Sequence, residues 1–452
     1  MVPDLQTVEW PAERLPVLAS ADVVVAGGGT SGFIAATAAA RTGARTVLVE
    51  RFGYLGGCTT APYNTTLNAF ADMAGRPVVR GLAWEFVERM ERDGQALLGA
   101  RGRNQLWPVW TRKVALDMVT EAGVDLFFYT WVSDVLAEDG RLRGLVVQTK
   151  GGRGVLLAKT FVDATGDADL AALAGAPFEM ADPDSLQQVS CDYLACGVDA
   201  ARVLEWARAH REELVMLEGA ESEHRPAGPQ PMLTFVIPGP LSPEGDHIGV
   251  MPTVKLCIYR EAVRLQGNTE VDPLDPRGLT QAEVQGLRGA LEHLAYLQER
   301  VPGFEHAFLV AQHHLGVRES RRIVGEYVIT LDDVQSGARF DDVVALNCRH
   351  LDYHLKGTVF RLELVRAAHD IPLRALLPQR VENLLVCGRA IACDHLAQAS
   401  LRGAATCMAT GHAAGSAAAL AARGSGRLRE LDVRRLQQTL LEQGAILNQP
   451  NL

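Results

Sequence analysis

The chain has 452 residues, of which 48% are hydrophobic and 22% charged, as is typical of a soluble globular protein with two or three domains. The net charge of −10, together with the absence of a basic run or an aromatic-interleaved basic patch, disfavours a nucleic-acid partner. The small-residue run 403–422 is too weakly apolar to span a membrane, and residues 1–13 are acidic rather than basic, so we expect no signal peptide and a cytoplasmic location.

The cysteines give no sign of a metal or cluster site. No two of them form a C-x-x-C pair, so neither zinc nor iron–sulfur ligation is expected, and we predict no metal. The eight are Cys58, Cys191, Cys196, Cys257, Cys348, Cys387, Cys393 and Cys407.

The first strong signal is the segment "ADVVVAGGGTSGFIAATAAARTGARTVLVER", residues 21–51. Residues 21–26 predict a buried strand, 31–42 an alanine-rich helix that Gly43 stops, and 46–49 a second strand. Between the first strand and the helix, Gly27, Gly29 and Gly32 satisfy G-x-G-x-x-G. Glu50 follows the second strand. Strand, glycines, helix, strand and acid in this order predict a dinucleotide site.

Each part of this segment has a chemical use. The N-terminus of the predicted helix would offer N–H groups and a partial positive charge to a diphosphate. The Glu50 carboxylate would accept the two hydroxyls of an adenosine ribose and repel a 2′-phosphate. The alternative interpretation is a glycine-rich strand-to-helix turn without a ligand.

The next segments predict a helical excursion over residues 77–111 and then a β-meander. Its strands are expected at 126–129, 132–138, 142–149 and 154–158, with turns at Asp139-Gly140 and Gly151-Gly152.

Two later segments repeat the pattern of small residues at a strand end. "KTFVDATGDADLAALAG", residues 159–175, predicts a strand, a turn and a helix. Residues 381–422 predict a strand at 383–387, a turn at Gly388-Arg389 and a long alanine helix starting near Ala405 or Thr406. A helix of such small residues suits close approach to a flat ligand or another backbone. Three segments meeting at one sheet edge suit FAD better than NAD.

The predicted fold is α/β, with a Rossmann-like FAD-binding domain of parallel sheet plus β-meander and an inserted α+β substrate domain. The FAD-binding domain takes residues 1–175 and returns at 380–425, the substrate domain takes 176–379, and a helical tail takes 426–452. Within the substrate domain, helical patterns cover 199–218 and 280–300.

The chain resembles the FAD-dependent oxidoreductase family, whose relatives share the glutathione-reductase-type flavin fold. The resemblance rests on "GGGTSGFIAA", "LVERFGYLGGCTT", "DATGDADLA", "GVRESRRIVGEY" and "NLLVCGRAIACDHLAQASLRGAATCMATGHAAG". It implies that the first glycines and Glu50 hold the ADP half, that the 56–59 segment follows the diphosphate, and that the last segments reach the ribityl and pyrimidine end. The expected cofactor residues are Gly27, Gly29, Thr30, Ser31, Gly32, Glu50, Arg51, Gly56, Gly57, Cys58, Thr59, Thr165, Gly166, Asp167, Gly388, Arg389, Ala405 and Thr406.

The catalytic candidates come from polar residues in the second half of the chain. His395 lies between the Gly388-Arg389 turn and the last helix, where the resemblance places the isoalloxazine, and an imidazole there would take a proton as hydride leaves for flavin N5. Arg402 would position the substrate or favour an anionic flavin. Arg318 and Arg321 belong to a basic cluster that would bind an anionic substrate, unless these arginines only pair with nearby acids. Tyr353 and His354 are further candidates.

These observations predict hydride transfer between a small polar or anionic substrate and FAD. Electrons would pass to an unidentified external acceptor, because no second G-x-G-x-x-G follows a strand and a built-in NAD(P)H domain is therefore not expected. Two alternatives stay open. One is a thiol–disulfide oxidoreductase using Cys58, for which no nearby resolving cysteine is visible, and the other is a non-catalytic FAD-binding protein. A homo-oligomer is compatible with the sequence.

Overall fold

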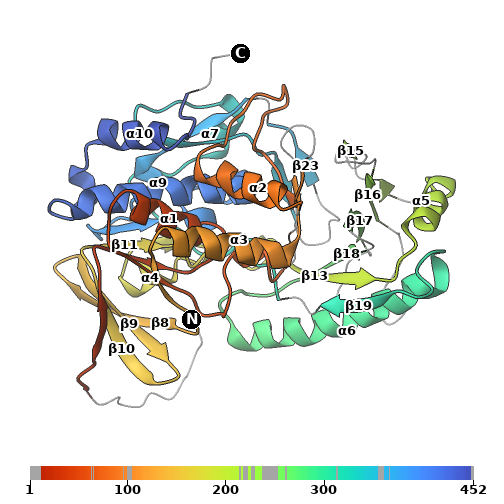
Figure 1. Ribbon diagram of the computed structural model, residues 1–452, viewed down its shortest axis with the longest axis horizontal. Helices are drawn as coiled ribbons and strands as arrows, with labels where there is room; N and C mark the ends of the chain where they lie inside the picture. Colours follow the sequence, from red (N-terminus) through yellow and green to blue (C-terminus); the bar gives the residue numbers. More distant parts are fainter. Residues whose placement is uncertain are drawn as a thin grey trace.

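The computed structural model describes residues 12–448 except 63, 65, 95, 99–103, 213–214, 217–221, 225–229, 237–252, 260–261, 312–313, 355–360 and 366. The elements run from a compact sheet-and-helix part to a second sheet at the far edge of the molecule, where α5 and α6 lie (Figure 1).

A five-stranded parallel sheet forms the centre of the larger part, in the order β25-β11-β2-β3-β7. Its strands are β2 (Val23–Ala26), β3 (Thr46–Val49), β7 (Asp125–Phe127), β11 (Thr160–Asp163) and β25 (Leu384–Val386). The sequence "VVVA" of β2 is buried along its whole length, as expected for a central parallel strand covered on both faces. β25 lies beside β11 in this sheet although it follows β11 by more than 200 residues in the chain.

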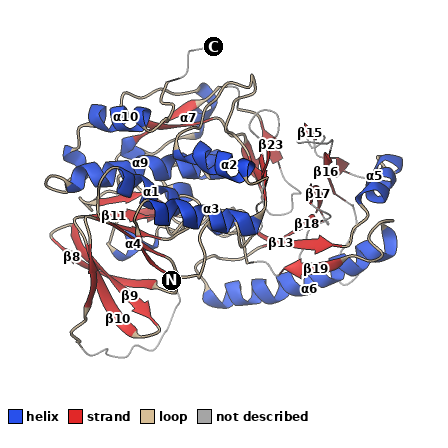
Figure 2. Ribbon diagram, viewed as in Figure 1, coloured by secondary structure: helices blue, strands red, loops and turns tan. Residues whose placement is uncertain are grey.

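The small-residue helix predicted near the C-terminus packs directly on the first helix. α9 (Ala404–Ala422) crosses α1 (Gly32–Arg41) so closely that a Cβ on Gly411 would lie 2.2 Å from the Ser31 carbonyl oxygen, and one on Gly415 2.0 Å from that of Ala35. Alanine and glycine are thus used for contact between two backbones. Figure 2 shows both helices beside α2 (Leu82–Arg92) and α3 (Pro108–Glu121).

The excursion between β3 and β7 is only partly helical, so the prediction for residues 77–111 is wrong in part. Between α2 and α3 the chain forms two short strands, β5 (Ala96–Leu98) and β6 (Asn104–Leu106), and β6 also pairs with β4 (Thr66–Leu67). α3 then begins at Pro108, a residue preorganised for the first turn of a helix.

The meander is confirmed with one exchange of strands. β8 (Trp131–Glu138), β9 (Arg141–Thr149) and β10 (Gly152–Leu157) form an antiparallel sheet, and the fourth strand is β1 (Val17–Ser20), parallel to β10. The segment expected to open the meander is instead β7, at the edge of the parallel sheet. α4 (Asp169–Leu173) lies between the meander and β11, touching β8 and β11.

The second sheet runs in the order β14-β16-β17-β18-β13-β19, with β15 paired to β16. Its strands are β13 (Val189–Cys196), β14 (Val215–Met216), β15 (Ser222–His224), β16 (Gln230–Val236), β17 (Thr253–Tyr259), β18 (Ala262–Thr269) and β19 (Phe308–Ala311). α6 (Pro276–Arg300) packs on it through a separate core that includes Ala195, Leu294 and Leu297. α6 starts four residues earlier than predicted, because the Asp275 side chain caps Arg277 and Gly278.

α5 (Ala200–Ala209) ends well before the predicted position 218. A third region joins the two sheets and carries β12 (Phe178–Glu179), β20 (Arg322–Ile323), α7 (Leu331–Ser336), β21 (Val343–Asn347), β22 (Leu351–Tyr353), β23 (Arg361–Glu363), β24 (His369–Pro372) and α8 (His395–Leu401). α10 (Val433–Glu442) forms the helical tail, packed against α9.

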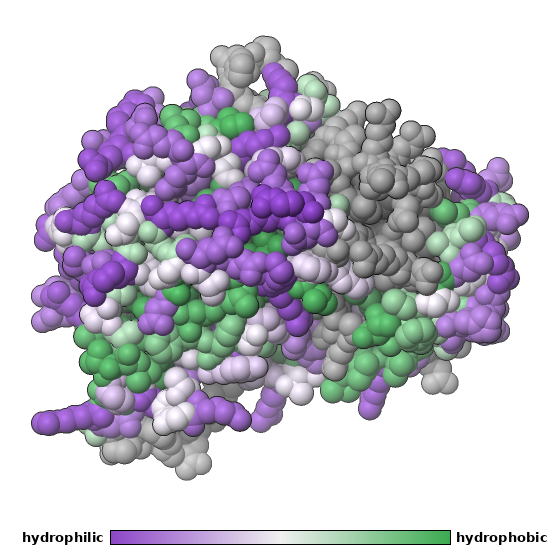
Figure 3. Space-filling view, viewed as in Figure 1, coloured by the Kyte–Doolittle hydropathy of each residue, from purple (hydrophilic) through white to green (hydrophobic). Residues whose placement is uncertain are grey.

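The surface in this view is uneven. Hydrophilic residues dominate over α2 and α10, whereas apolar ones gather over the meander and α6 (Figure 3), including Trp131, Leu287 and Leu291. Among the described residues, no helix combines the length and apolar character that crossing a bilayer requires.

Candidate active site

The turn between β2 and α1 is built for glycine. Gly27 has φ +95°, and a Cβ there would lie 2.6 Å from the Ala164 carbonyl oxygen. A Cβ on Gly32 would lie only 1.8 Å from the Gly27 oxygen, whereas one on Gly29 would meet nothing nearer than the Gly57 Cα at 3.9 Å. Gly27 and Gly32 are therefore required by the fold itself. Gly29 is not, which leaves its bare backbone available to a ligand.

A second stretch of bare backbone lies against this turn. Gly56 and Gly57 both have positive φ, and a Cβ on Gly57 would lie 2.8 Å from the Gly29 Cα. The Thr30 hydroxyl donates to the Gly56 carbonyl at 3.0 Å and lies 3.3 Å from the Cys58 sulfur. The two predicted diphosphate segments are thus side by side, with Ser31 starting α1 and Thr59 donating to Gly56 at 2.9 Å.

Glu50 is held at the end of β3 by two backbone amides. Gly28 N–H donates to one carboxylate oxygen at 2.7 Å and Phe52 N–H to the other at 2.8 Å. Burial raises the pKa of Glu50, although these two amides oppose the rise. Each oxygen keeps a second lone pair for a hydroxyl. Next to it, the Arg51 guanidinium lies about equally over the Phe52 and Trp131 rings, 4.9 and 5.0 Å from their centres.

The "ATGD" segment after β11 is fixed by Asp163. This buried carboxylate accepts from the Thr165 amide and hydroxyl at 3.0 and 2.7 Å and from the Ala171 amide at 2.9 Å. Gly166 has φ +87°, and a Cβ there would lie 3.0 Å from an Arg389 nitrogen. The turn is therefore shaped around Arg389.

Asp167 joins three segments that are far apart in the chain. Its carboxylate pairs with Arg389 and accepts from the Ser320 hydroxyl at 2.5 Å, and its carbonyl accepts from Arg321 at 2.8 Å. Arg321 also pairs with Asp169. Arg321, a predicted substrate ligand, thus donates to residues of the "ATGD" turn and of the helix that follows. It lies among the predicted cofactor residues.

The turn before α9 is tied down by Asn347, which the sequence did not point to. Its amide donates to Ser400 at 2.7 Å and contacts His369 at 2.9 Å, and its carbonyl oxygen accepts from Thr406 at 2.7 Å. The Gly403 N-cap provides no side-chain cap for α9, so the first turn of this helix keeps backbone N–H groups for an acceptor. Ala405 is buried there, and Gly388, φ +81°, donates to Thr410 at 3.1 Å.

His395 begins α8 and is oriented by a buried carboxylate. Its Nδ1 lies 2.7 Å from a Glu319 oxygen, which also accepts from Arg322 at 2.6 Å. Glu319 is 1% exposed, and its other oxygen accepts from the backbone amide of Gln187 at 3.3 Å. Because a carboxylate accepts the Nδ1 proton, the neutral ring presents an unprotonated Nε2, the form that a general base needs. About a quarter of the His395 side chain is exposed.

The same face of α8 continues to Arg402 through Gln398. Gln187 donates to the Gln398 side chain at 3.1 Å, and Arg402 donates to Gln187 at 3.2 Å and to the Asp352 carbonyl at 2.6 Å. Positions 395, 398 and 402 share one helical face, a spacing that would have revealed Gln398 beside the two predicted residues. Gln187 carries no such signal, since it precedes β13 by two residues.

The remaining candidates are more deeply placed. Arg318 is buried and donates to the Gln188 carbonyl at 2.5 Å and the Asn268 side chain at 2.7 Å. Tyr353 is 5% exposed on β22. His354 lies 3.0 Å from Asp352, and burial lowers the pKa of His354 to about 3, so its ring is neutral near pH 7. His395 is therefore the better placed of the two histidines for proton transfer.

Cys58 is partly exposed beside Thr30, and the structure brings Cys407 of α9 near both Cys58 and Arg389. Burial raises the pKa of Cys407 to about 12, which makes it a poor thiolate. Cys257 lies outside the described side chains. In the described part of the chain, no three His, Cys, Asp or Glu side chains gather as metal ligands would.

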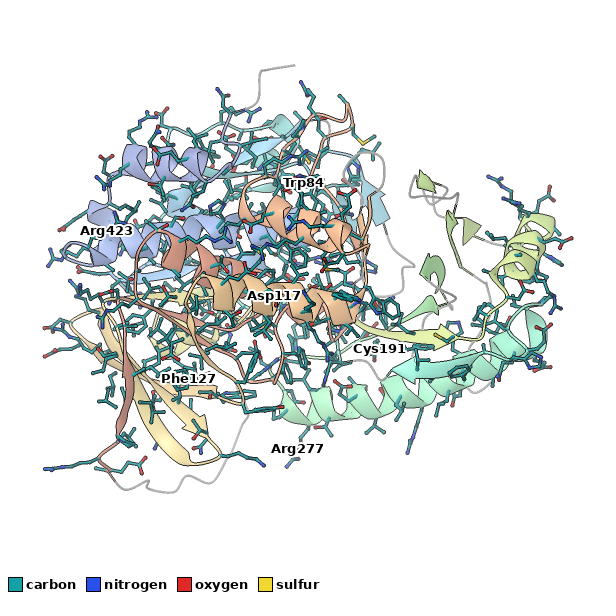
Figure 4. The ribbon with its side chains drawn as sticks, viewed as in Figure 1. Trp84, Asp117, Phe127, Cys191, Arg277 and Arg423 are labelled. Carbon is teal, nitrogen blue, oxygen red and sulfur yellow. The ribbon has the colours of Figure 1, made fainter. Side chains whose placement is uncertain are left out.

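Figure 4 shows the side chains of the larger part and of the second sheet with its helices. Phe127 lies at the end of β7 in the larger part, and Cys191 lies on β13, where the second sheet approaches it (Figure 4). Gln187 and Arg318 precede and follow that second sheet in the chain, so the candidate site lies where the two parts meet.

Comparison with known proteins gives a family and several distant structures. A family model described as FAD dependent oxidoreductase matches residues 22–440. A thiamine thiazole synthase from Aeropyrum pernix is 30% identical over 145 residues, which are 32% of this chain and 50% of the synthase, so the chain spans about half the length of that relative.

Two solved structures illustrate the distance. A geranylgeranyl bacteriochlorophyll reductase-like protein from Thermoplasma acidophilum is 12% identical, with a TM-score of 0.48 over 94% of this chain and 84% of that one. The p-nitrophenol 4-monooxygenase from Pseudomonas putida is 11% identical, with a TM-score of 0.46 over 94% and 85% of the two chains.

Proposed function

This chain belongs to the FAD dependent oxidoreductase family, and from that premise we propose that it transfers a hydride equivalent between a small polar or anionic organic substrate and FAD, with electrons passing to an external acceptor. The observation that carries the proposal is the buried Glu319 carboxylate on His395 Nδ1.

The residues present fit FAD. The bare backbones of Gly29 and Gly57 face each other at the N-terminus of α1, which suits a diphosphate, and Glu50 keeps lone pairs for ribose hydroxyls. The uncapped first turn of α9 offers N–H groups to the pyrimidine end. Bound FAD would supply the two-electron acceptor, which no side chain of the protein provides.

His395 is the proposed base. Glu319 fixes its tautomer, so Nε2 takes the proton from the O–H or N–H of an alcohol or amine while the adjacent C–H leaves as hydride. The imidazolium that forms is stabilised by the Glu319 carboxylate 2.7 Å away, and Arg322 holds that carboxylate in place by donating to it at 2.6 Å. Arg402 and Gln398 share a helical face with His395 and are joined to each other through Gln187.

The thiol alternative has less support. The described cysteine that interacts electrostatically with Cys58 is Cys407, whose high pKa makes it slow to attack a disulfide. The other alternative, a non-catalytic FAD-binding protein, is distinguished from the proposed enzyme by the flavin reduction experiment below.

The test is anaerobic single-turnover reduction of the bound flavin. With a substrate found by screening polar alcohols, amines and their carboxylates, His395→Ala should keep FAD and substrate affinity but slow reduction by about 10²- to 10⁴-fold. His306→Ala, at an exposed position of the second sheet region, is the matched control and should reduce at the wild-type rate. An unchanged rate in His395→Ala removes this residue from the mechanism, and a flavin that no substrate bleaches supports the non-catalytic alternative.

A further inference from the structure

The cluster around Asp352 holds more positive charge than the protein neutralises. Arg349 contacts the Asp352 carboxylate at 2.5 Å and Arg402 approaches it at 3.5 Å. Within the described residues, this is the only carboxylate within 4 Å of either guanidinium. Both arginine side chains are 11% exposed. One carboxylate therefore serves two largely buried cations.

The hydrogen bonds are incomplete as well. The Nε atoms of Arg349 and of Arg402 are both buried without an acceptor among the described residues. Leaving a charged donor buried and unsatisfied costs more than leaving a neutral one, so such donors mark a place for an acceptor. Two of them in neighbouring guanidiniums point to an anion that accepts from both.

The surroundings reinforce the charge excess. Burial, together with repulsion from the nearby Arg349 and Arg318, lowers the pKa of Arg402 to about 9, although the Asp352 and Glu319 carboxylates oppose the fall. His354, the other group on Asp352, is neutral near pH 7, so the Asp352 carboxylate faces two cations rather than three. An uncompensated buried cation is expensive, and an anionic ligand removes that cost.

The position ties this cluster to the proposed base. Arg402 follows His395 by seven residues on the same face of α8, which separates their backbones by about 10 Å along the helix. The Arg402 guanidinium donates to the Gln187 side chain, and the Gln187 backbone amide donates to the Glu319 carboxylate that contacts His395. Gln187 and Gln398 fill the space between them through their own hydrogen bonds.

We propose that Arg402 and Arg349 form a carboxylate-binding subsite, and that the substrate oxidised or reduced beside His395 carries a carboxylate anchored there. This inference rests on the proposed function. Asp352 is the built-in carboxylate that holds both guanidiniums in place and competes with the ligand for them. The reduced flavin is a second anion that these two arginines would stabilise. The experiment separates it from a substrate carboxylate.

The test uses the FAD-loaded protein and isothermal titration with acetate, with acetamide as the neutral isostere. Wild type should bind acetate and not acetamide. Arg402→Met and Arg349→Met should weaken acetate binding at least tenfold, while Arg374→Met, at an exposed ion pair with Asp342, should not change it. Asp352→Asn should tighten acetate binding because the internal competitor is gone. If Arg402→Met does not fold, Arg402→Lys, which keeps the charge, is titrated in its place.

Three results would overturn the proposal. They are equal binding of acetate and acetamide, acetate binding that survives in the arginine variants, and no tightening in Asp352→Asn. A lower flavin reduction potential in Arg402→Met with unchanged acetate affinity would assign the charge to the reduced flavin instead. Because the titration needs no turnover, its outcome is independent of whether His395 proves to be the base.

Discussion

The two halves of the candidate site are built in opposite ways. The cradle at β2, α1 and β3 uses backbone: glycines packed against carbonyl oxygens, and two amides on Glu50, all within about 30 consecutive residues. The junction around α8 uses side chains from segments hundreds of residues apart, linked as His395 to Glu319, Gln187 and Arg402. The backbone half has no room for a Cβ at Gly27 or Gly32, whereas the side-chain half depends on each partner being present.

The largest expected effect tests the backbone half. Gly32→Ala puts a methyl group 1.8 Å from the Gly27 oxygen, so the turn must open, and we expect the apoprotein to lose roughly 3 kcal/mol or more of unfolding free energy. Denaturant unfolding of apoprotein measures this.

Gly29→Ala is the matched control, since its Cβ meets only one atom at 3.9 Å. The variant should leave the stability of the apoprotein near wild type. It should weaken the binding of FAD, because the proposed diphosphate site lies against that bare backbone. If Gly29→Ala binds FAD as tightly as wild type, the diphosphate does not lie there.

The junction is tested by Glu319→Gln. An amide can present N–H to Nδ1 and favour the other tautomer of His395, and it no longer stabilises the imidazolium, so flavin reduction should slow by about 10- to 100-fold at unchanged substrate affinity. Stopped-flow reduction measures both quantities. Glu319→Asp should recover part of the rate, and a rate equal to wild type in Glu319→Gln would show that the pair is only structural.

Glu50→Ala affects the cradle through a lost acceptor. It removes the ribose ligand and leaves the Gly28 and Phe52 amides without their partner, so FAD affinity should fall by about 1 to 3 kcal/mol, with a smaller loss of apoprotein stability. Equilibrium dialysis of FAD and thermal unfolding measure the two effects. If the variant retains FAD as tightly as wild type does, Glu50 is not the ribose ligand.

The smallest effect concerns pH. Burial, with repulsion from Asp167 and Asp163, raises the pKa of Asp169 to about 6 from 3.8, so the folded state binds this proton more tightly and stability falls as pH rises from about 4 to 6. Because over a third of the Asp169 side chain is exposed, the size should be about 1 kcal/mol. Asp169→Asn should flatten this part of the stability profile in unfolding titrations, and an unaltered slope would refute the assignment.

The sequence predicted the cradle well because its information is local. Strand, glycine turn, helix and acid follow one another, so the periodicity of 21–51 was sufficient to place Gly27, Gly32 and Glu50. The junction was predicted only in its most distinctive residues. His395 and Arg402 were named, but Glu319 was seen only as a partner for arginines, and Asn347 and Gln187 were not seen, because their roles arise from tertiary pairing that no spacing encodes. The excursion over 77–111 failed for a related reason, since β5 and β6 exist only as partners in a small sheet.

The late arrival of β25 and α9 has a consequence for synthesis of the chain. β11 ends at Asp163 and β25 begins at Leu384, so 220 residues separate the two neighbours. At typical translation speeds this delay is roughly 10 to 45 s. During that time the nascent chain carries an unpaired edge on β11 and the face of α1 that α9 later covers. We therefore expect a chain truncated before residue 384 to aggregate rather than to form a smaller flavin-binding unit, because it lacks the partners of β11 and α1.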